Sequence, residues 1–130
     1  MKISPVVHFE MPYGDSKKMT DFYGNVFDWQ FEHLGEKMGN YIVAITTETD
    51  DKKMIKTPGT INGGFYKKAQ DPLSHCTGIV IAVENLEESM QKIKEAGGKI
   101  MADWEIPKVG RYASVVDVEG NRIGILQPKM

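Results

Sequence analysis

Residues 79–98 read IVIAVENLEESMQKIKEAGG, in which a strand pattern passes directly into a helix pattern. Residues 79–83 are apolar and mostly β-branched, which favours a strand. Asn85, with Glu88 three positions on, matches a capping box that opens a helix, and Gly97-Gly98 ends it. A strand followed by an amphipathic helix is therefore predicted. The apolar stripe of that helix consists of Leu86, Met90, Ile93 and Ala96.

The first half of the chain repeats this order. Residues 6–11 have the composition of a short strand, and Asp15 can cap the helix that follows. A helix is predicted over residues 16–27, because its apolar residues recur at helical spacing and would face a sheet. The apolar stripe of this helix consists of Met19, Phe22, Tyr23, Val26 and Phe27.

Each predicted helix is followed by three strand candidates. Both halves thus have the order βαβββ, which indicates a duplication inside a single domain over residues 1–130, with module one at about 1–68 and module two at about 75–130. The predicted fold class is α+β. Two tandem βαβββ modules form a curled mixed sheet, a half-barrel, with the helices outside and a pocket on the concave side. The strand candidates are residues 29–34, 41–47 and 61–66 in the first half and residues 99–102, 112–118 and 122–127 in the second.

Composition limits the class of partner. The 130 residues carry 16 Lys and Arg against 18 Asp and Glu, a formal net charge of -2, so there is no basic field for nucleic acid. No stretch approaches the ~20 apolar residues that a membrane-spanning helix needs. The single cysteine, Cys76, cannot form an internal disulfide, which agrees with a reducing cytoplasm. These features predict a cytoplasmic protein with a small-molecule ligand and with neither nucleic-acid nor membrane partners.

His8 is the candidate site residue whose position on the sheet strand alternation predicts most clearly. Alternation places His8 and Glu10 on one face of the first strand and Phe9 and Met11 on the other. The apolar pair would meet the helix, so His8 and Glu10 would line the cavity. There the imidazole could ligate a metal, move a proton or hydrogen-bond a ligand, or it could be a hydrogen-bonded structural histidine. Both interpretations stay open at this point.

Gly63 and Gly64 lie inside a strand candidate, INGGF. Glycines in a strand weaken its pairing and mark a bulge or a close approach of another group to the backbone. A ligand lying against them and a bend at a curved corner of the sheet explain them equally well.

Residues 104–110, WEIPKVG, are predicted to form a loop between two strands of the second half. Trp104 in such a loop could close the cavity over a ligand, cover the core or lie in a dimer contact.

Five motifs together resemble the vicinal oxygen chelate superfamily, and they span nearly the whole chain. This superfamily includes glyoxalase I, extradiol dioxygenases, fosfomycin-resistance enzymes and bleomycin-resistance binding proteins, and the chain is most similar to its uncharacterised glyoxalase-related branch. The resemblance implies a paired βαβββ architecture and a homodimer. The motifs are VVHFEMP at 6–12, DFYGNVFDWQFE at 21–32, INGGF at 61–65, IVIAVENLEESMQKIKEAGGKI at 79–100 and DVEGNRIGILQ at 117–127.

The resemblance also implies where a metal would be held. Enzymes of the family bind one divalent metal through side chains at four inner-strand positions, two in each half. His8 fits the first position, but Gly78 stands at the third and Gly124 at the fourth. By the internal repeat, the second falls on Gly63 or Gly64. Because glycine has no side chain to donate, the resemblance predicts no metal ligand set and no cofactor.

The function indicated is that of a glyoxalase/bleomycin resistance-like protein that binds a small molecule in its cavity without a metal. An alternative is a metal-dependent enzyme that uses His8, either a lyase resembling lactoylglutathione lyase, an isomerase or a dioxygenase. Metal-free acid–base catalysis by His8 and Glu10 is a third possibility, so catalysis stays open. Neither the ligand nor the pathway follows from the sequence. The candidate ligand-binding residues are His8, Glu10, Asn62, Trp104 and Tyr112.

Overall fold

The computed structural model describes residues 3–129 and confirms the α+β fold with two βαβββ modules. Every predicted strand and helix is present, most with ends shifted by one or two residues. The first module consists of β1 (Val6–Tyr13), α1 (Ser16–Phe27), β2 (Gln30–His33), β3 (Ile42–Ile45) and β4 (Asn62–Lys67). The second consists of β5 (Gly78–Ala82), α2 (Leu86–Glu95), β6 (Lys99–Ile106), β7 (Gly110–Val116) and β8 (Arg122–Pro128). Two short 3₁₀ helices, η1 (Glu36–Met38) and η2 (Pro72–His75), lie in connections.

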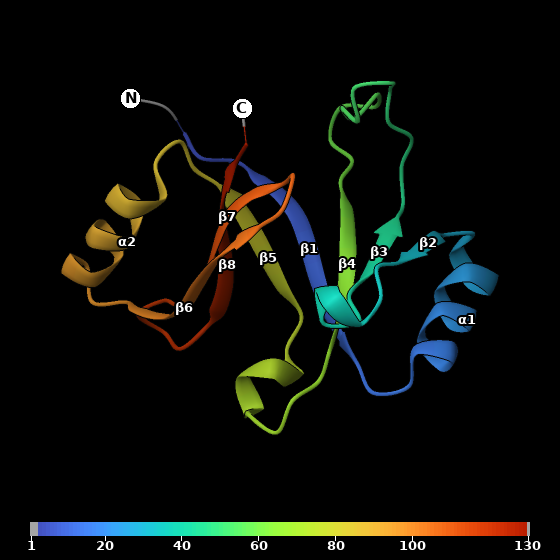
Figure 1. The fold of residues 1–130 in the computed structure, drawn as a ribbon, viewed down its shortest axis with the longest axis horizontal. Helices are drawn as coiled ribbons and strands as arrows, with labels where there is room; N and C mark the ends of the chain where they lie inside the picture. The colour runs from blue at the N-terminus through green and yellow to red at the C-terminus, as the bar shows by residue number, and fades with distance from the viewer. Residues whose placement is uncertain (1–2, 130) are drawn as a thin grey trace. The chain divides into compact units, whose positions relative to one another are not determined.

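The two modules have the same strand order and the same strand directions. In the first, β2 pairs with β3 and β3 with β4, both antiparallel, and β4 pairs with β1 in parallel (Figure 1). In the second, β6 pairs with β7 and β7 with β8, both antiparallel, and β8 pairs with β5 in parallel. The duplication seen in the sequence is therefore also a duplication of topology.

The chain divides into two compact units close to the predicted module boundary. One unit runs from His8 to Thr77, and the other contains the described residues up to Val7 and those from Gly78 on. The start of β1 thus belongs with the second module, where the amide of Ala82 donates a 2.9 Å hydrogen bond to the carbonyl of Pro5. Within residues 3–129, no helix has the length and apolar character needed to cross a membrane.

The first module packs α1 on one face of its sheet. Met19 and Tyr23 of the helix contact the buried core, and the Tyr23 ring stacks on Trp29 at a centroid distance of 4.7 Å. The prediction of a five-residue buried stripe was wrong in part, because the other three aromatic and aliphatic residues of α1 point away from the sheet. These are Phe22, Val26 and Phe27, each 56% exposed.

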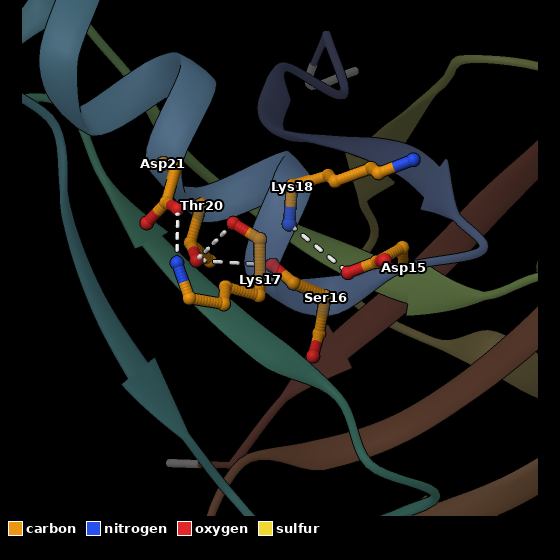
Figure 2. Close-up of polar contacts among 6 residues, drawn as sticks. All are labelled: Asp15, Ser16, Lys17, Lys18, Thr20 and Asp21. Atoms are coloured by element: carbon orange, nitrogen blue, oxygen red, sulfur yellow. Dashed lines mark hydrogen bonds and ion pairs between the residues drawn. The ribbon is translucent and has the colours of Figure 1, made fainter.

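The start of α1 is fixed as predicted. Asp15 has an extended backbone, and its Oδ1 accepts a 3.1 Å hydrogen bond from the amide of Lys18 (Figure 2). This bond satisfies one of the backbone donors that a helix leaves unpaired at its first turn. Lys17 and Asp21 form an exposed ion pair one turn further on, at 2.7 Å.

The second module packs α2 on its own sheet in the same way. Asn85 caps this helix by accepting a hydrogen bond from the amide of Glu88. Leu86 and Met90 are buried as predicted, with Ile93 partly buried beside them. The prediction was wrong for Ala96, which is exposed because it lies beyond the last residue of the helix. The strand residues in this core are Ala113, Val115, Ile125 and, partly buried, Ile100 and Ile123.

The predicted loop at residues 104–110 was wrong. The strand β6 continues to Ile106 and pairs with β7 down to Gly110, so Pro107 and Lys108 lie in a tight turn of a long hairpin. The Pro107 in this segment suggested a loop, yet a proline at a hairpin turn removes no ladder hydrogen bond. Trp104 therefore lies in a strand and not in a flexible cover.

Candidate functional site

The strand β1 separates polar and apolar side chains as its alternation predicts. Phe9 and Met11 pack into the core under α1, whereas His8 and Glu10 project from the opposite face. His8 and Glu10 thus lie on the face of the sheet on which strand alternation had placed them.

Tyr41, immediately before β3, joins His8 to Glu10. Its hydroxyl donates a 3.1 Å hydrogen bond to Glu10 Oε2, and its oxygen lies 3.0 Å from His8 Nε2. We call these three side chains the polar triad. A phenol has a single hydrogen to donate, and that hydrogen is directed at the carboxylate. Nε2 of His8 therefore faces a lone pair of the Tyr41 oxygen.

The environment of His8 favours the neutral imidazole. Burial of the ring lowers the pKa of His8 below its ordinary value, and the nearby charge of Glu10 opposes this shift only in part. An uncharged imidazole can accept a hydrogen bond at one ring nitrogen while it donates at the other.

The neighbouring glycines Gly63 and Gly64 each lie against an aromatic ring, one on each face of the sheet. Gly63 lies under the ring of Phe9 on the core face of the sheet, and a methyl group there would lie within about 2.5 Å of that ring's Cδ2. Gly64 lies under the phenol of Tyr41 on the other face, where any Cβ would overlap the ring and its oxygen. The glycines are thus explained by a close approach, and the approaching groups are side chains of this chain.

The second module contains the same device. Gly124 lies under the ring of Tyr112, whose oxygen a Cβ at this glycine would overlap. Tyr112 is buried, and its ring lies 4.9 Å from that of Trp104, its partner across the β6–β7 ladder. The structure therefore brings two of the candidate residues, Trp104 and Tyr112, together as a cross-strand aromatic pair.

The strand registers show which residues correspond between the modules. Glu10 is paired with Gly64 in the first, and Val80 is paired with Gly124 in the second. Two residues before these strand positions, the first module has His8 and the second has a glycine. The second of the four positions implied by the resemblance is therefore Gly64, and not Gly63.

The four positions do not fit a divalent metal. One offers an imidazole and three are glycines, Gly64, Gly78 and Gly124. A tyrosine ring covers two of those glycines, so no side chain could stand there without displacing a phenol. Phenols at ordinary pH are protonated, and a single imidazole does not hold zinc or a similar ion. Across residues 3–129, no three His, Cys, Asp or Glu side chains are grouped closely enough to bind a metal.

Asn62, the remaining candidate, has a structural contact. It is paired with His8 across β1 and β4, and its Oδ1 accepts hydrogen bonds of 2.8 and 2.9 Å from the amides of Thr46 and Thr47. The side-chain carbonyl of Asn62 thus binds the backbone directly after β3.

A separate hollow of about 280 Å³ lies at the other end of β1, beside the start of α1. Neither His8 nor Glu10 lines it. This hollow could not be predicted from the sequence, because its walls come from turns and strand ends that are distant in the chain. Its lining residues are Tyr13, Gly14, Ser16, His33, Gly35, Asn40 and Lys67.

Interpretation of the sequence missed Tyr41. A signal was present, since the segment YIVAI at 41–45 and the segment YASVV at 112–116 each have a tyrosine directly before the small and apolar residues of the third strand of a module. Tyr41 stands two residues before the residue paired with Gly64, and Tyr112 stands two residues before the residue paired with Gly124. Aligning the two modules strand by strand would have selected it.

Comparison with known families identifies one match. The model of the Glyoxalase/Bleomycin resistance protein/Dioxygenase superfamily matches residues 6–125, which is nearly the whole chain. No curated protein sequence matches the chain.

Solved structures with the same fold include proteins with and without an assigned activity. Methylmalonyl-CoA epimerase from Mycobacterium tuberculosis has a TM-score of 0.66 at 11% identity, covering 96% of this chain and 88% of that one. The Streptomyces coelicolor epimerase in complex with 2-nitronate-propionyl-CoA has a TM-score of 0.68 at 11% identity, covering 99% and 100%. A hypothetical protein from Bacillus halodurans has a TM-score of 0.69 at 14% identity, covering 99% and 97%. At these identities the similarity shows the fold alone.

Proposed function

Because the chain belongs to the Glyoxalase/Bleomycin resistance protein/Dioxygenase superfamily, we propose that it binds a small organic molecule without a metal. The polar triad of His8, Glu10 and Tyr41 is the centre of the proposed site. The observation that supports this proposal most is the pair of tyrosines, Tyr41 and Tyr112, lying over Gly64 and Gly124. These rings occupy the room that metal-binding side chains would need.

The triad favours a polar organic ligand over an ion. Hydrogen bonds link His8, Tyr41 and Glu10 to one another, so a ligand meets an ordered set of donors and acceptors and not isolated charges. Asn62 lies beside His8 on the neighbouring strand and adds an amide group.

Titration calorimetry with Ni²⁺, Zn²⁺ and Mn²⁺ tests the metal-free part of this proposal. We expect no one-to-one binding in the micromolar range for any of the three ions. Binding of that strength that disappears in His8→Ala would contradict the proposal. His33→Ala is the matched control, because this exposed histidine lies outside the triad and would reveal adventitious surface binding.

Native mass spectrometry of the protein purified from expressing cells tests the ligand-binding part. We expect the protein to carry a small molecule retained from the cells or to bind one from a screened library. The fraction of protein with this molecule bound should fall in His8→Ala and in Tyr41→Phe. Equal occupancy in wild type and both variants would place the ligand elsewhere, with the hollow beside α1 as the next site to probe through Lys67→Ala.

A metal-dependent enzyme of the same superfamily is the second candidate. Two observations favour it: His8 stands at the first ligand position, and structures with this fold include methylmalonyl-CoA epimerases. An assay on methylmalonyl-CoA with added Co²⁺ separates the candidates. Metal-dependent turnover that is lost in His8→Ala would favour the metal-dependent enzyme. If the protein binds its ligand without a metal, no metal-dependent turnover is expected.

A homodimer is part of the proposal. Its support is the exposed apolar face of α1, formed by Phe22, Val26 and Phe27, together with the resemblance to a family of dimers. Light scattering should give twice the 14.6 kDa of one chain. A particle of 14.6 kDa at high concentration would contradict it.

A cytoplasmic location is also proposed. Its support is Cys76, which is a free and exposed thiol in the structure. Full reaction of Cys76 with a maleimide in protein taken directly from cells is expected. A thiol already oxidised in that protein would argue against this location.

A further inference from the structure

We propose that Tyr41 is a positioning residue that holds the proton of His8 on Nε2, so that Nδ1 presents a lone pair to a ligand that donates a hydrogen bond. This inference rests on the proposed function and specifies its ligand class. The ligand would carry a hydroxyl, an N–H or an acidic C–H at the position that meets His8.

The direction of the hydrogen bonds carries the inference. The Tyr41 hydroxyl donates its only hydrogen to Glu10 Oε2 at 3.1 Å. The bond between Tyr41 Oη and His8 Nε2, at 3.0 Å, then needs its hydrogen from the imidazole. Nε2 carries the proton for this reason, and in a neutral ring the other nitrogen must be an acceptor.

The position of Tyr41 is fixed independently of His8. Its ring lies against Gly64, where only a glycine leaves room for it. Gly64 is in turn paired with Glu10, so the acceptor and the tyrosine are set by the same two strands. A ring confined in this way supports a histidine more firmly than a mobile surface side chain would.

Burial of His8 supports the same arrangement, because it lowers the pKa of the imidazole and favours the neutral form. A neutral ring with a free lone pair discriminates among ligands. It accepts from alcohols, amides and carbon acids and has no charge with which to attract a carboxylate or phosphate.

Nitrogen-15 NMR of the histidine rings tests this inference without any knowledge of the ligand. At about pH 8, above the ordinary histidine pKa of about 6.5, wild-type protein should show His8 with an Nε2–H proton protected from exchange with water and with an unprotonated Nδ1. Tyr41→Phe keeps the ring over Gly64 but removes the hydroxyl. We expect the protected Nε2–H signal to disappear in this variant.

Tyr13→Phe is the matched control. It removes a hydroxyl from β1, the strand that carries His8, but that hydroxyl donates to the carbonyl of Asn40, and the ring lies in the core. The His8 signal should be unchanged in this variant. Spectra of His8→Gln assign the resonance among the three histidines of the chain.

A wild-type His8 protonated on Nδ1 would overturn the inference, and so would an Nε2–H signal equally protected in Tyr41→Phe. The wild-type spectrum decides the first point even if Tyr41→Phe does not fold. Either result would contradict the role of Tyr41 without contradicting metal-free binding. Conversely, micromolar metal binding at His8 would end the proposed function through a different measurement.

Discussion

The hydroxyl of Tyr41 lies between the imidazole of His8 and the carboxylate of Glu10 and links the two side chains by hydrogen bonds. Glu10 accepts from Tyr41, and Tyr41 accepts from His8, so each member orients the next. Gly64 leaves room for the phenol of Tyr41, whereas a side chain at position 64 would overlap it.

The stability of the protein should depend on the protonation of His8. Its pKa is lowered in the folded protein, so the unfolded chain binds a proton more readily. The contribution of His8 to the free energy of unfolding is therefore fully present above the ordinary histidine pKa of about 6.5. It is lost as the pH falls from there toward the lower pKa of His8 in the folded protein. Urea unfolding of wild type and His8→Gln at several pH values measures this. Identical pH dependence in the two proteins would show that His8 contributes nothing.

The two glycines should respond differently to alanine. Gly63→Ala would push a methyl group into the Phe9 ring, which is held in the core 5.5 Å from Trp29, so a loss on the order of 1–3 kcal/mol is expected. Gly64→Ala should cost less stability, because Tyr41 can turn away from the sheet, but it should remove the protected His8 signal.

Gly14→Ala is the control for both, since a Cβ there meets nothing within 4 Å. Its effect should stay within about 0.5 kcal/mol. Thermal unfolding of the three variants makes the comparison. Equal losses at Gly63 and Gly14 would contradict the packing described for Phe9.

At the scale of elements, local signals predicted the structure well. Both helix starts are set by caps that lie within three residues of the amides they bind, so Asp15 and Asn85 could be identified from the sequence. Strand alternation on β1 likewise needed only neighbouring residues. These features depend on short-range chemistry, which the order of residues records directly.

Features that depend on distant residues could not be predicted in the same way. Tyr41 is 33 residues from His8 and 31 from Glu10, and only the pairing of strands brings the three together. Helical periodicity identified an apolar stripe on α1, yet it did not show that Phe22 lies outside the packed face. In β6, Pro107 suggested a break, although the hairpin register places this residue in the turn.

The capping of α1 allows a test at this scale. Asp15→Ala should lower the free energy of unfolding by about 0.5–2 kcal/mol, because the amide of Lys18 loses its acceptor. Asp21→Ala removes an exposed carboxylate from the same helix and should cost no more than about 0.5 kcal/mol. Chemical denaturation compares them, and a larger effect at Asp21 would contradict the assignment of the cap.

At the scale of the whole molecule, one topology is used twice with different residues. Both modules place a tyrosine over a glycine, and the first module alone has a histidine at the corresponding position of its first strand. The superfamily fold is thus retained, while glycines stand at three of the four positions where the resemblance implies metal-binding side chains, and phenols cover two of these glycines. Metal-free binding is the function that this arrangement supports.

Elemental analysis of protein purified without chelators tests this claim most directly. Plasma mass spectrometry should find Zn, Ni, Co, Mn and Fe each far below one atom per chain, with His8→Ala indistinguishable from wild type. Close to one atom of a single metal per chain, lost in His8→Ala, would contradict the account.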